Sequence, residues 1–141
     1  MRAIVVDTNV LFSSLRAKNT RIREILERSD CRFYAPNFLA AEIFKHKERI
    51  LNKSKATEDE VYELLYKILQ RVKFINEEAI SLGNFVQAYK LCGAVDEKDT
   101  PFVALALELE AELWTRDKTL KRGLIKNGWN AFFNENDISF E

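Results

Sequence analysis

The stretch DEKDTPFVALALELEAELWTRDKTL, residues 96–120, combines an apolar helical run with a short apolar strand. Asp99 stands just before the helical run, and Asp117 stands three residues after Trp114 at the end of the strand. A helix that is apolar on nearly every side has to pack against a sheet and neighbouring helices. Each acid is therefore either the cap of a buried element or part of a site.

Short apolar runs alternate with helical patterns along the rest of the chain. Strands are expected at residues 3–6, 32–35, 72–75, 113–114 and 131–133. The first run is short and uninterrupted, as in a central strand that is covered on both faces. Strands that alternate with helices predict an α/β fold, namely a three-layer α/β/α sandwich with a central parallel sheet of about four to five strands.

Four further helices are expected from apolar residues at helical spacing. The apolar residues that mark these helices are, in chain order, Ile22, Ile25 and Leu26; Leu39, Ile43 and Phe44; Val61, Leu64, Leu65, Ile68 and Leu69; and Ile80, Phe85, Val86 and Tyr89. Pro36 and Asn37 open the second of these helices, with Phe44 among its inward residues. Thr57 and Glu60 form a capping box before the third, and the fourth is capped near Asn76.

Length and composition favour one domain that spans residues 1–141. Of the 141 residues, 47% are hydrophobic, enough for a core that needs no disulfide or structural metal. Cys31 and Cys92 lie far apart in apolar segments, so buried thiols in a reducing compartment are expected. The strand-like start indicates no signal peptide, and no apolar run reaches the roughly 18 residues of a membrane span. We therefore expect a cytoplasmic protein.

The 22 basic and 22 acidic residues cancel, which argues against a polycationic domain. The basic residues are nevertheless grouped. Residues 45–55 contain five basic residues against one acidic residue, and so do residues 116–126. Residues 16–28 contain five against two. Runs of this kind are usually solvated helix faces, and they become informative only where they surround a site.

Acids follow or precede several of the expected buried elements. Asp7 ends the first strand, Asp117 follows a later strand, and Asp99 precedes the buried helix. Glu42 lies in the helix after the second strand. In open parallel sheets, sites form outside the carboxyl ends of the strands. If the strands before Asp7 and Asp117 are neighbours, these acids meet at one edge of the sheet, together with Asp99.

Taken singly, most of these acids have an ordinary structural explanation. Asp99 is a plausible N-cap, Asp117 fits a cap and a site equally well, and Glu42 is typical of a solvent-facing helix residue. Asp7 favours a site, because an acid directly after buried apolar residues is costly unless it is paired or binds a cation. Converging carboxylates repel one another, and a divalent metal is the simplest way to keep them charged.

Four motifs, read together, resemble the PIN-domain family of metal-dependent ribonucleases, which includes VapC-like toxins of toxin–antitoxin pairs. The motifs are VVDTNVL (5–11), PNFLAAEIFKH (36–46), DEKDTPFVALAL (96–107) and LWTRDKTL (113–120). They span almost the whole chain and occur in the family's order. The resemblance implies a PIN-like fold and an endoribonuclease.

The resemblance also implies a set of site residues. The family's catalytic, metal-binding acids fall on Asp7, Glu42, Asp99 and Asp117, and Asp96 is a candidate for a further ligand. Residues that would orient these carboxylates fall on Thr8, Asn9 and Thr115.

Hard carboxylate oxygens, with no histidine or cysteine cluster, indicate Mg²⁺ or Mn²⁺ rather than zinc. His46 lies a turn from Glu42 and is interpreted as a surface residue. Lys45, Lys47, Arg116 and Lys118 are candidates for RNA phosphate contacts. RNA is the implied substrate, and an antitoxin protein and a second copy of the chain are the implied partners. The target RNA, the antitoxin, the oligomeric state and the number of metals cannot be deduced from the sequence.

Other functional classes fit less well. A phosphoaspartate-forming phosphatase needs a second acid two residues after the first, where this chain has Asn9, and a receiver domain needs an acidic pair at its first strand. A non-catalytic RNA- or partner-binding module of the same fold remains as the alternative.

Overall fold

A four-stranded parallel sheet forms the centre of the protein, with strand order β3-β2-β1-β4. The computed structural model describes residues 1–15, 20–53 and 57–138. The strands are β1 (Arg2–Val6), β2 (Cys31–Pro36), β3 (Val72–Ile75) and β4 (Glu112–Trp114). The α-helices are α1 (Thr8–Ser14), α2 (Thr20–Leu26), α3 (Phe38–Lys45), α4 (Lys47–Lys53), α5 (Glu58–Arg71), α6 (Leu82–Asp96), α7 (Thr100–Leu109) and α8 (Lys118–Lys126). Three short 3-10 helices are η1 (Glu77–Ala79), η2 (Glu97–Asp99) and η3 (Glu135–Asp137).

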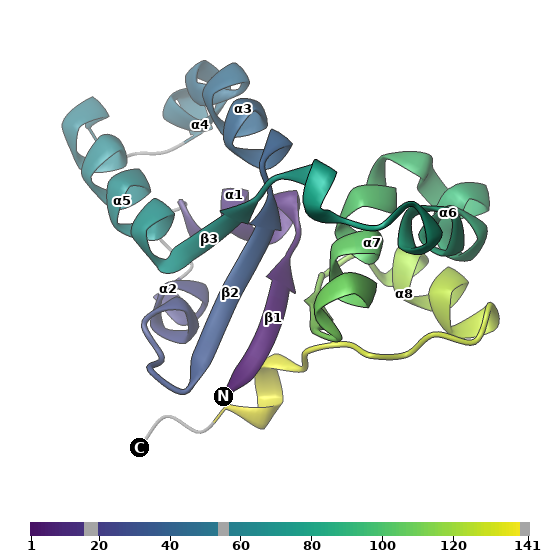
Figure 1. Ribbon diagram of the computed structural model, residues 1–141. Coiled ribbons are helices and arrows are strands. Elements are labelled where there is room, and N and C mark those ends of the chain that lie inside the picture. Colours follow the sequence, from purple (N-terminus) through teal and green to yellow (C-terminus); the bar gives the residue numbers. More distant parts are fainter. Residues whose placement is uncertain (16–19, 54–56, 139–141) are drawn as a thin grey trace.

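Helices cover both faces of the sheet (Figure 1). On one side α7 packs against β1, β2 and β4, and α6 packs on α7 and α8. On the other side lie α1, α2 and α5, with α5 in contact with β3, while α3 and α4 lie beyond the carboxyl end of β2. The predicted three-layer α/β/α fold is therefore confirmed. Within the described ranges, no helix is long and apolar enough to cross a lipid bilayer.

The core is centred on β1 and α7. Ile4, Val5 and Val6 are completely buried, as expected for a strand covered on both faces. In α7, every residue from 102 to 106 is buried, because the sheet covers one side of the helix and α6 covers another. Full burial of one large apolar side chain stabilises a fold by about 1.5–3 kcal/mol. This packing fixes where the residues at the ends of β1 and α7 emerge.

The pairing of β1 with β4 brings the ends of these strands together. Val6 lies opposite Trp114 in the parallel register, and the Asp7 N–H donates a hydrogen bond to the Trp114 carbonyl oxygen at 3.2 Å. The residues that follow both strands therefore leave the sheet at the same edge. We call this the carboxyl edge, and it is the edge at which parallel sheets form sites.

The strand expected at residues 131–133 is reduced to a single bridge. Phe132 pairs with Leu113 in the parallel direction. Directly afterwards, the Asn134 side chain accepts a hydrogen bond from the Asn136 N–H at 2.9 Å, so the backbone turns into η3 instead of continuing along β4. Within the described residues, the sheet has four strands and this one bridge.

Some apolar residues expected to mark buried helix faces are exposed. Phe44 is 59% exposed, so its expected inward position is wrong. Val86 and Tyr89 are 47% and 57% exposed. α3 lies beyond the strand ends and α6 is an outer helix, so the sheet does not cover the far sides of either.

The start of α6 also differs from the expected helix start. The cap at Asn76 belongs to η1, where the Asn76 side chain accepts a hydrogen bond from the Glu78 N–H at 3.0 Å. Ser81 caps α6 itself, accepting a hydrogen bond from the Asn84 N–H at 3.3 Å. A short turn of 3-10 helix therefore separates β3 from α6.

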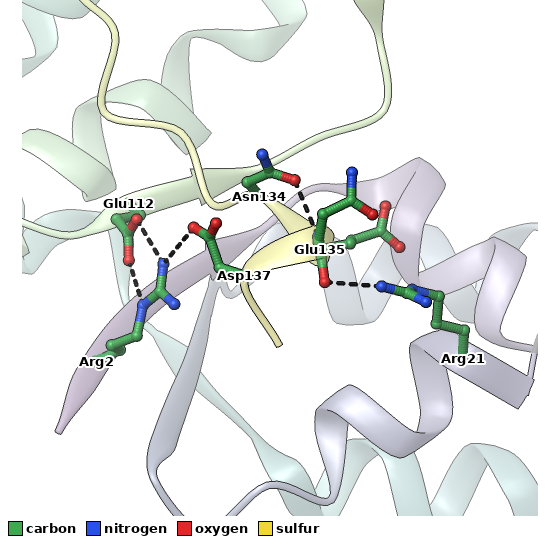
Figure 2. A network of polar contacts seen from close by, with 7 residues as sticks. Arg2, Arg21, Glu112, Asn134, Glu135 and Asp137 are labelled. Carbon is green, nitrogen blue, oxygen red and sulfur yellow. Dashed lines mark hydrogen bonds and ion pairs between the residues drawn. The ribbon is translucent and has the colours of Figure 1, made fainter. Parts of the chain in front are cut away.

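Figure 2 shows the polar contacts that hold η3 against the sheet. Arg2 donates two hydrogen bonds to the Glu112 carboxylate, at 2.8 and 2.9 Å, and its Nη2 lies 3.7 Å from Asp137 Oδ2. Arg21 donates a hydrogen bond to the Glu135 carbonyl oxygen at 2.9 Å. These contacts tie the segment after the bridge to β1, β4 and α2.

Cys31 and Cys92 are free and buried, as expected from their apolar surroundings. Burial raises the pKa of both thiols. The thiolate is the reactive form of cysteine, so neither residue is suited to act as a nucleophile.

Candidate active site

Asp7 and Asp117 are both helix caps and residues of the carboxyl edge. Their backbones are extended, with φ −82° and ψ 168° at Asp7 and φ −77° and ψ 102° at Asp117. Asp7 Oδ1 accepts a hydrogen bond from the Val10 N–H at 2.9 Å, at the start of α1. Asp117 Oδ1 accepts one from the Leu120 N–H at 3.0 Å, at the start of α8. One oxygen of each carboxylate is thus held by a helix N-terminus.

Asp99 precedes α7 but does not cap it. Its backbone is helical, with φ −83° and ψ −8°, and its side chain makes no capping hydrogen bond. The pKa of Asp99 is raised to about 6, first by burial and then by the charges of Asp96, Asp7 and Asp117. The structure therefore brings Asp7 and Asp117, which are distant in sequence, as well as the nearby Asp96, close enough to Asp99 for their charges to act on it.

Asp7 is the most deeply buried of these acids, with 5% of its surface exposed. Burial raises the pKa of Asp7, while hydrogen bonds from the Thr115 hydroxyl and from the backbone N–H groups of Val10 and Asn9 oppose this rise. Thr115 is 1% exposed, and its Oγ1 also accepts a hydrogen bond from the Asp117 N–H at 3.1 Å. Thr115 thereby links Asp7 to the backbone of Asp117.

Glu42 reaches the region from α3. Its Oε2 lies 3.2 Å from His46 Nε2, one turn further along the helix, and both side chains are about one-third exposed. Phe38 shares this helix face because it precedes Glu42 by four residues. The Phe38 ring packs edge-on against Phe102 of α7, and the His46 ring packs edge-on against Phe12 of α1.

The face that carries Glu42 therefore turns towards α1 and α7, the two helices whose N-termini carry Asp7 and Asp99. The groups that raise the Asp99 pKa are the three other aspartates, and Glu42 is not among them. The structure thus couples four of the five predicted acids, and it places the fifth on a neighbouring helix. The predicted surface position of His46 becomes a partly buried one, because Glu42 and Phe12 contact its ring.

The donor chemistry of the carboxyl edge suits a hard cation. Carboxylate oxygens are the ligands that Mg²⁺, Mn²⁺ and Ca²⁺ prefer. A cation would relieve the repulsion that, after burial, raises the Asp99 pKa. Across residues 1–15, 20–53 and 57–138, however, no three acidic, histidine or cysteine side chains are already arranged as a cation site. The acids are gathered, and their side chains are not preorganised around a single point.

The remaining predicted residues lie around these acids. Thr8 is the first residue of α1 and is partly buried, and Asn9 is exposed. Lys45 and Lys118 are exposed at the end of α3 and the start of α8. Within the basic runs, Arg16, Lys18 and Lys55 lie outside the described residues.

Two of the predicted RNA-binding residues already have partners in the protein. Arg116 donates hydrogen bonds to both carboxylate oxygens of Glu135, at 2.6 and 3.1 Å. The ammonium group of Lys47 lies 5.7 Å from the centre of the Tyr62 ring. The Glu135 carboxylate compensates the charge of Arg116 before any RNA is bound.

The family of the protein follows from its sequence and its fold together. Residues 5–130 match the family model of the PIN domain. The chain belongs to the PIN-domain family. The matched range contains all four motifs quoted above and every acid at the carboxyl edge. Membership of the PIN-domain family supports nuclease activity in general, in a family that uses divalent metal ions.

Solved structures share the fold of this PIN domain. One is VapBC2 from Rickettsia felis bound to a DNA fragment from their promoter, with a TM-score of 0.64 and 17% identity over 85% of this chain and 92% of that chain. Another is FitAcB from Neisseria gonorrhoeae, with a TM-score of 0.64 and 19% identity over 96% of this chain and 99% of that chain. A comparison with curated proteins gives no match.

Proposed function

We propose that this PIN-domain protein is a divalent-metal-dependent endoribonuclease that hydrolyses RNA phosphodiester bonds. The observation that carries this proposal is the meeting of Asp7 and Asp117 after the paired strands β1 and β4, with Asp99 at the start of α7 close enough for their charges to raise its pKa. Such a group of carboxylates is unfavourable when ionised unless a cation compensates the charge. Carboxylates that gather at one edge of a sheet and perturb one another's pKa are more typical of a functional site than of a structural element. We propose that residues 1–141 act as a single PIN-like domain.

The acids act together as metal ligands in this proposal. Asp7, Asp99, Asp117 and Glu42 would hold Mg²⁺ or Mn²⁺, with Asp96 as a further ligand. The cation would supply an activated water and stabilise charge on the phosphate in the transition state.

The surrounding residues of the chain orient the acids. The Thr115 hydroxyl donates to Asp7 and accepts from the Asp117 N–H, so it fixes these two groups relative to one another. The Val10 and Leu120 N–H groups hold one oxygen of each carboxylate. His46 restrains the Glu42 carboxylate from one turn away.

A toxin–antitoxin context is part of the proposal. The PIN-domain family includes VapC-like toxins, and VapBC2 is among the solved structures with this fold. We propose that the protein acts on RNA in the cytoplasm, with an antitoxin protein as its partner and with assembly into a homodimer.

A metal-dependence experiment tests the proposed activity. Cleavage of a generic single-stranded RNA is measured with Mg²⁺, with Mn²⁺ and with EDTA, for the wild type and for Asp7→Asn. Asn caps helices as well as Asp does, so this change keeps the hydrogen bond from Val10 and removes only the charge. Activity should fall by at least about 100-fold, because several kcal/mol of transition-state stabilisation depend on the cation.

A matched control is Asp30→Asn. Asp30 is exposed at the amino ends of the strands, where it pairs with Arg28. This variant should cleave RNA like the wild type. Metal-dependent cleavage that survives Asp7→Asn would remove the proposed site.

A non-catalytic RNA- or partner-binding module of the same fold is the second candidate. It is favoured by the fact that the acids of the described residues are not preorganised as a cation site. A wild-type protein that binds RNA and cleaves none, with either metal, would establish this candidate instead.

A further inference from the structure

A basic groove runs along the contact between α6 and α8. It has a volume of about 470 Å³, and its walls include Val95 from α6 and Thr119, Arg122 and Lys126 from α8. Gly123 makes the close approach of the two helices possible, since a Cβ atom at this position would clash with the Val95 side chain. The groove is therefore a consequence of how α6 packs against α8 (Figure 1).

One end of this groove meets the acids of the carboxyl edge. Val95 directly precedes Asp96, and Thr119 follows Asp117 by two residues. Asp96 is the last residue of α6 and caps η2, which ends at Asp99, and Asp117 follows β4 and caps α8. From Thr119 to Lys126, the groove follows α8 away from the acids for about 10 Å, at 1.5 Å per residue.

The cations of the groove are available for a ligand. Arg122 and Lys126 are exposed, and they share a face of α8 because they are four residues apart. Neither side chain has an ion-pair partner in the described part of the chain. Arg116, in contrast, is held by Glu135. Two unpaired cations that lie along α8, at increasing distance from the acids, are suited to binding successive phosphates of a nucleic-acid backbone.

We propose that the groove between α6 and α8 binds the phosphodiester backbone of single-stranded RNA on one side of the bond that is cut. This inference rests on the proposed ribonuclease function and adds the path of the substrate. Arg122 and Lys126 contact consecutive phosphates, and the Thr119 hydroxyl and the Asn127 amide line the same path. Contacts of this kind position the strand without reading its sequence.

A second basic hollow provides the control. It lies at the amino ends of β2 and β3, with a volume of about 670 Å³, and Arg32 and Lys73 contribute to its lining. This hollow is at the opposite end of the strands from the acids. Neutralising Arg32 and Lys73 removes the same charge from the protein as neutralising Arg122 and Lys126.

The test measures RNA affinity without cleavage. A fluorescein-labelled oligouridine is titrated with wild type, Arg122→Gln/Lys126→Gln and Arg32→Gln/Lys73→Gln in EDTA, where the proposed metal-dependent cleavage cannot proceed. Anisotropy is recorded between about 50 and 200 mM salt. Each lost phosphate contact should reduce the slope of log K against log salt by about 0.7, so the groove variant should lose about 1.4. Its affinity should fall about 10-fold, and the control variant should bind like the wild type.

Three other outcomes would overturn the inference. The groove variant could retain the wild-type slope, both variants could lose the same slope, or polyglutamate of equal charge could compete as well as RNA does. The last result would assign the groove to an acidic protein partner. These outcomes can be distinguished from failure of the proposed nuclease function. If the groove variant keeps the wild-type slope while the wild type cleaves RNA with metal, only the groove proposal is rejected. If the groove variant loses slope while the wild type cleaves no RNA, only the nuclease proposal is rejected.

Discussion

Asp99→Asn is predicted to stabilise the metal-free protein at neutral pH, although it should abolish the proposed activity. The Asp99 carboxyl has a pKa of about 6 instead of 3.8, because it is partly buried beside other aspartates. Below pH 3.8 this group is protonated in the folded and the unfolded chain, and it costs no stability. Between pH 3.8 and about 6 only the unfolded chain releases the proton, so the folded state becomes less favourable as pH rises.

The magnitude of the effect follows from the same values. At about 1.4 kcal/mol per pH unit, the difference between 3.8 and about 6 corresponds to about 3 kcal/mol. Solvent screens a partly exposed charge, so we expect about 1–2 kcal/mol. Asn cannot ionise. The Asp99→Asn variant should therefore have a free energy of unfolding higher than that of the wild type by this amount above about pH 7, and almost unchanged near pH 4.

Urea denaturation in EDTA at about pH 4 and pH 8 measures this difference. The matched control is Asp59→Asn, in the exposed first turn of α5, which should change the free energy of unfolding by no more than about 0.5 kcal/mol. Added Mg²⁺ should reduce the advantage of Asp99→Asn, because a bound cation stabilises the wild type. An Asp99→Asn variant that is less stable than the wild type at pH 8, or equally changed at both pH values, would refute the reasoning.

Three further predictions concern single contacts. Gly123→Ala should lower the free energy of unfolding by about 1–2 kcal/mol, because the clash with Val95 exceeds the gain of about 1 kcal/mol in helix propensity, and Val95→Ala in the same chain should restore stability. Thr115→Val removes the hydroxyl that donates to Asp7, so calorimetry should find Mn²⁺ bound about 10–100-fold more weakly while circular dichroism is unchanged. Thr57→Ala should destabilise α5 by about 1 kcal/mol in thermal unfolding, and Thr57→Ser should not.

The convergence of the aspartates could be predicted because it depends on topology alone. A parallel sheet places the residues after its strands at one edge, and the apolar pattern identifies the strands before Asp7 and Asp117. The buried helix after Asp99 had to pack against the same sheet. The sequence therefore predicts that these three acids meet on the condition that β1 and β4 are neighbours, and the structure meets this condition.

The local role of each acid could not be predicted, because it depends on backbone angles. Asp7 and Asp117 have the extended conformation that a capping residue needs, and both cap a helix. Asp99, for which a cap was the favoured interpretation on its own, makes no capping hydrogen bond, because η2 already gives it a helical backbone. Asp7 and Asp117 thus each cap a helix and also lie at the candidate site. From the sequence alone, capping and a site role were alternative interpretations.

Side-chain contacts between residues that are distant in the chain also could not be predicted from the sequence. Arg116 lies beside an acid in the chain, but its charge is compensated by Glu135, 19 residues further on. No separate helix was expected within residues 45–55, and Lys47–Lys53 forms α4. Arg122 and Lys126 belong to the basic run of residues 116–126. Their spacing of four residues is the pattern from which a shared face of a helix could have been predicted.

A crystal structure of the protein with Mn²⁺, located by its anomalous signal, tests the central claim most directly. The account predicts one ion or more at the carboxyl edge, with oxygens of Asp7, Asp99 and Asp117 at about 2.0–2.6 Å. An ion bound only elsewhere, or no ion at a concentration that supports RNA cleavage, would contradict it.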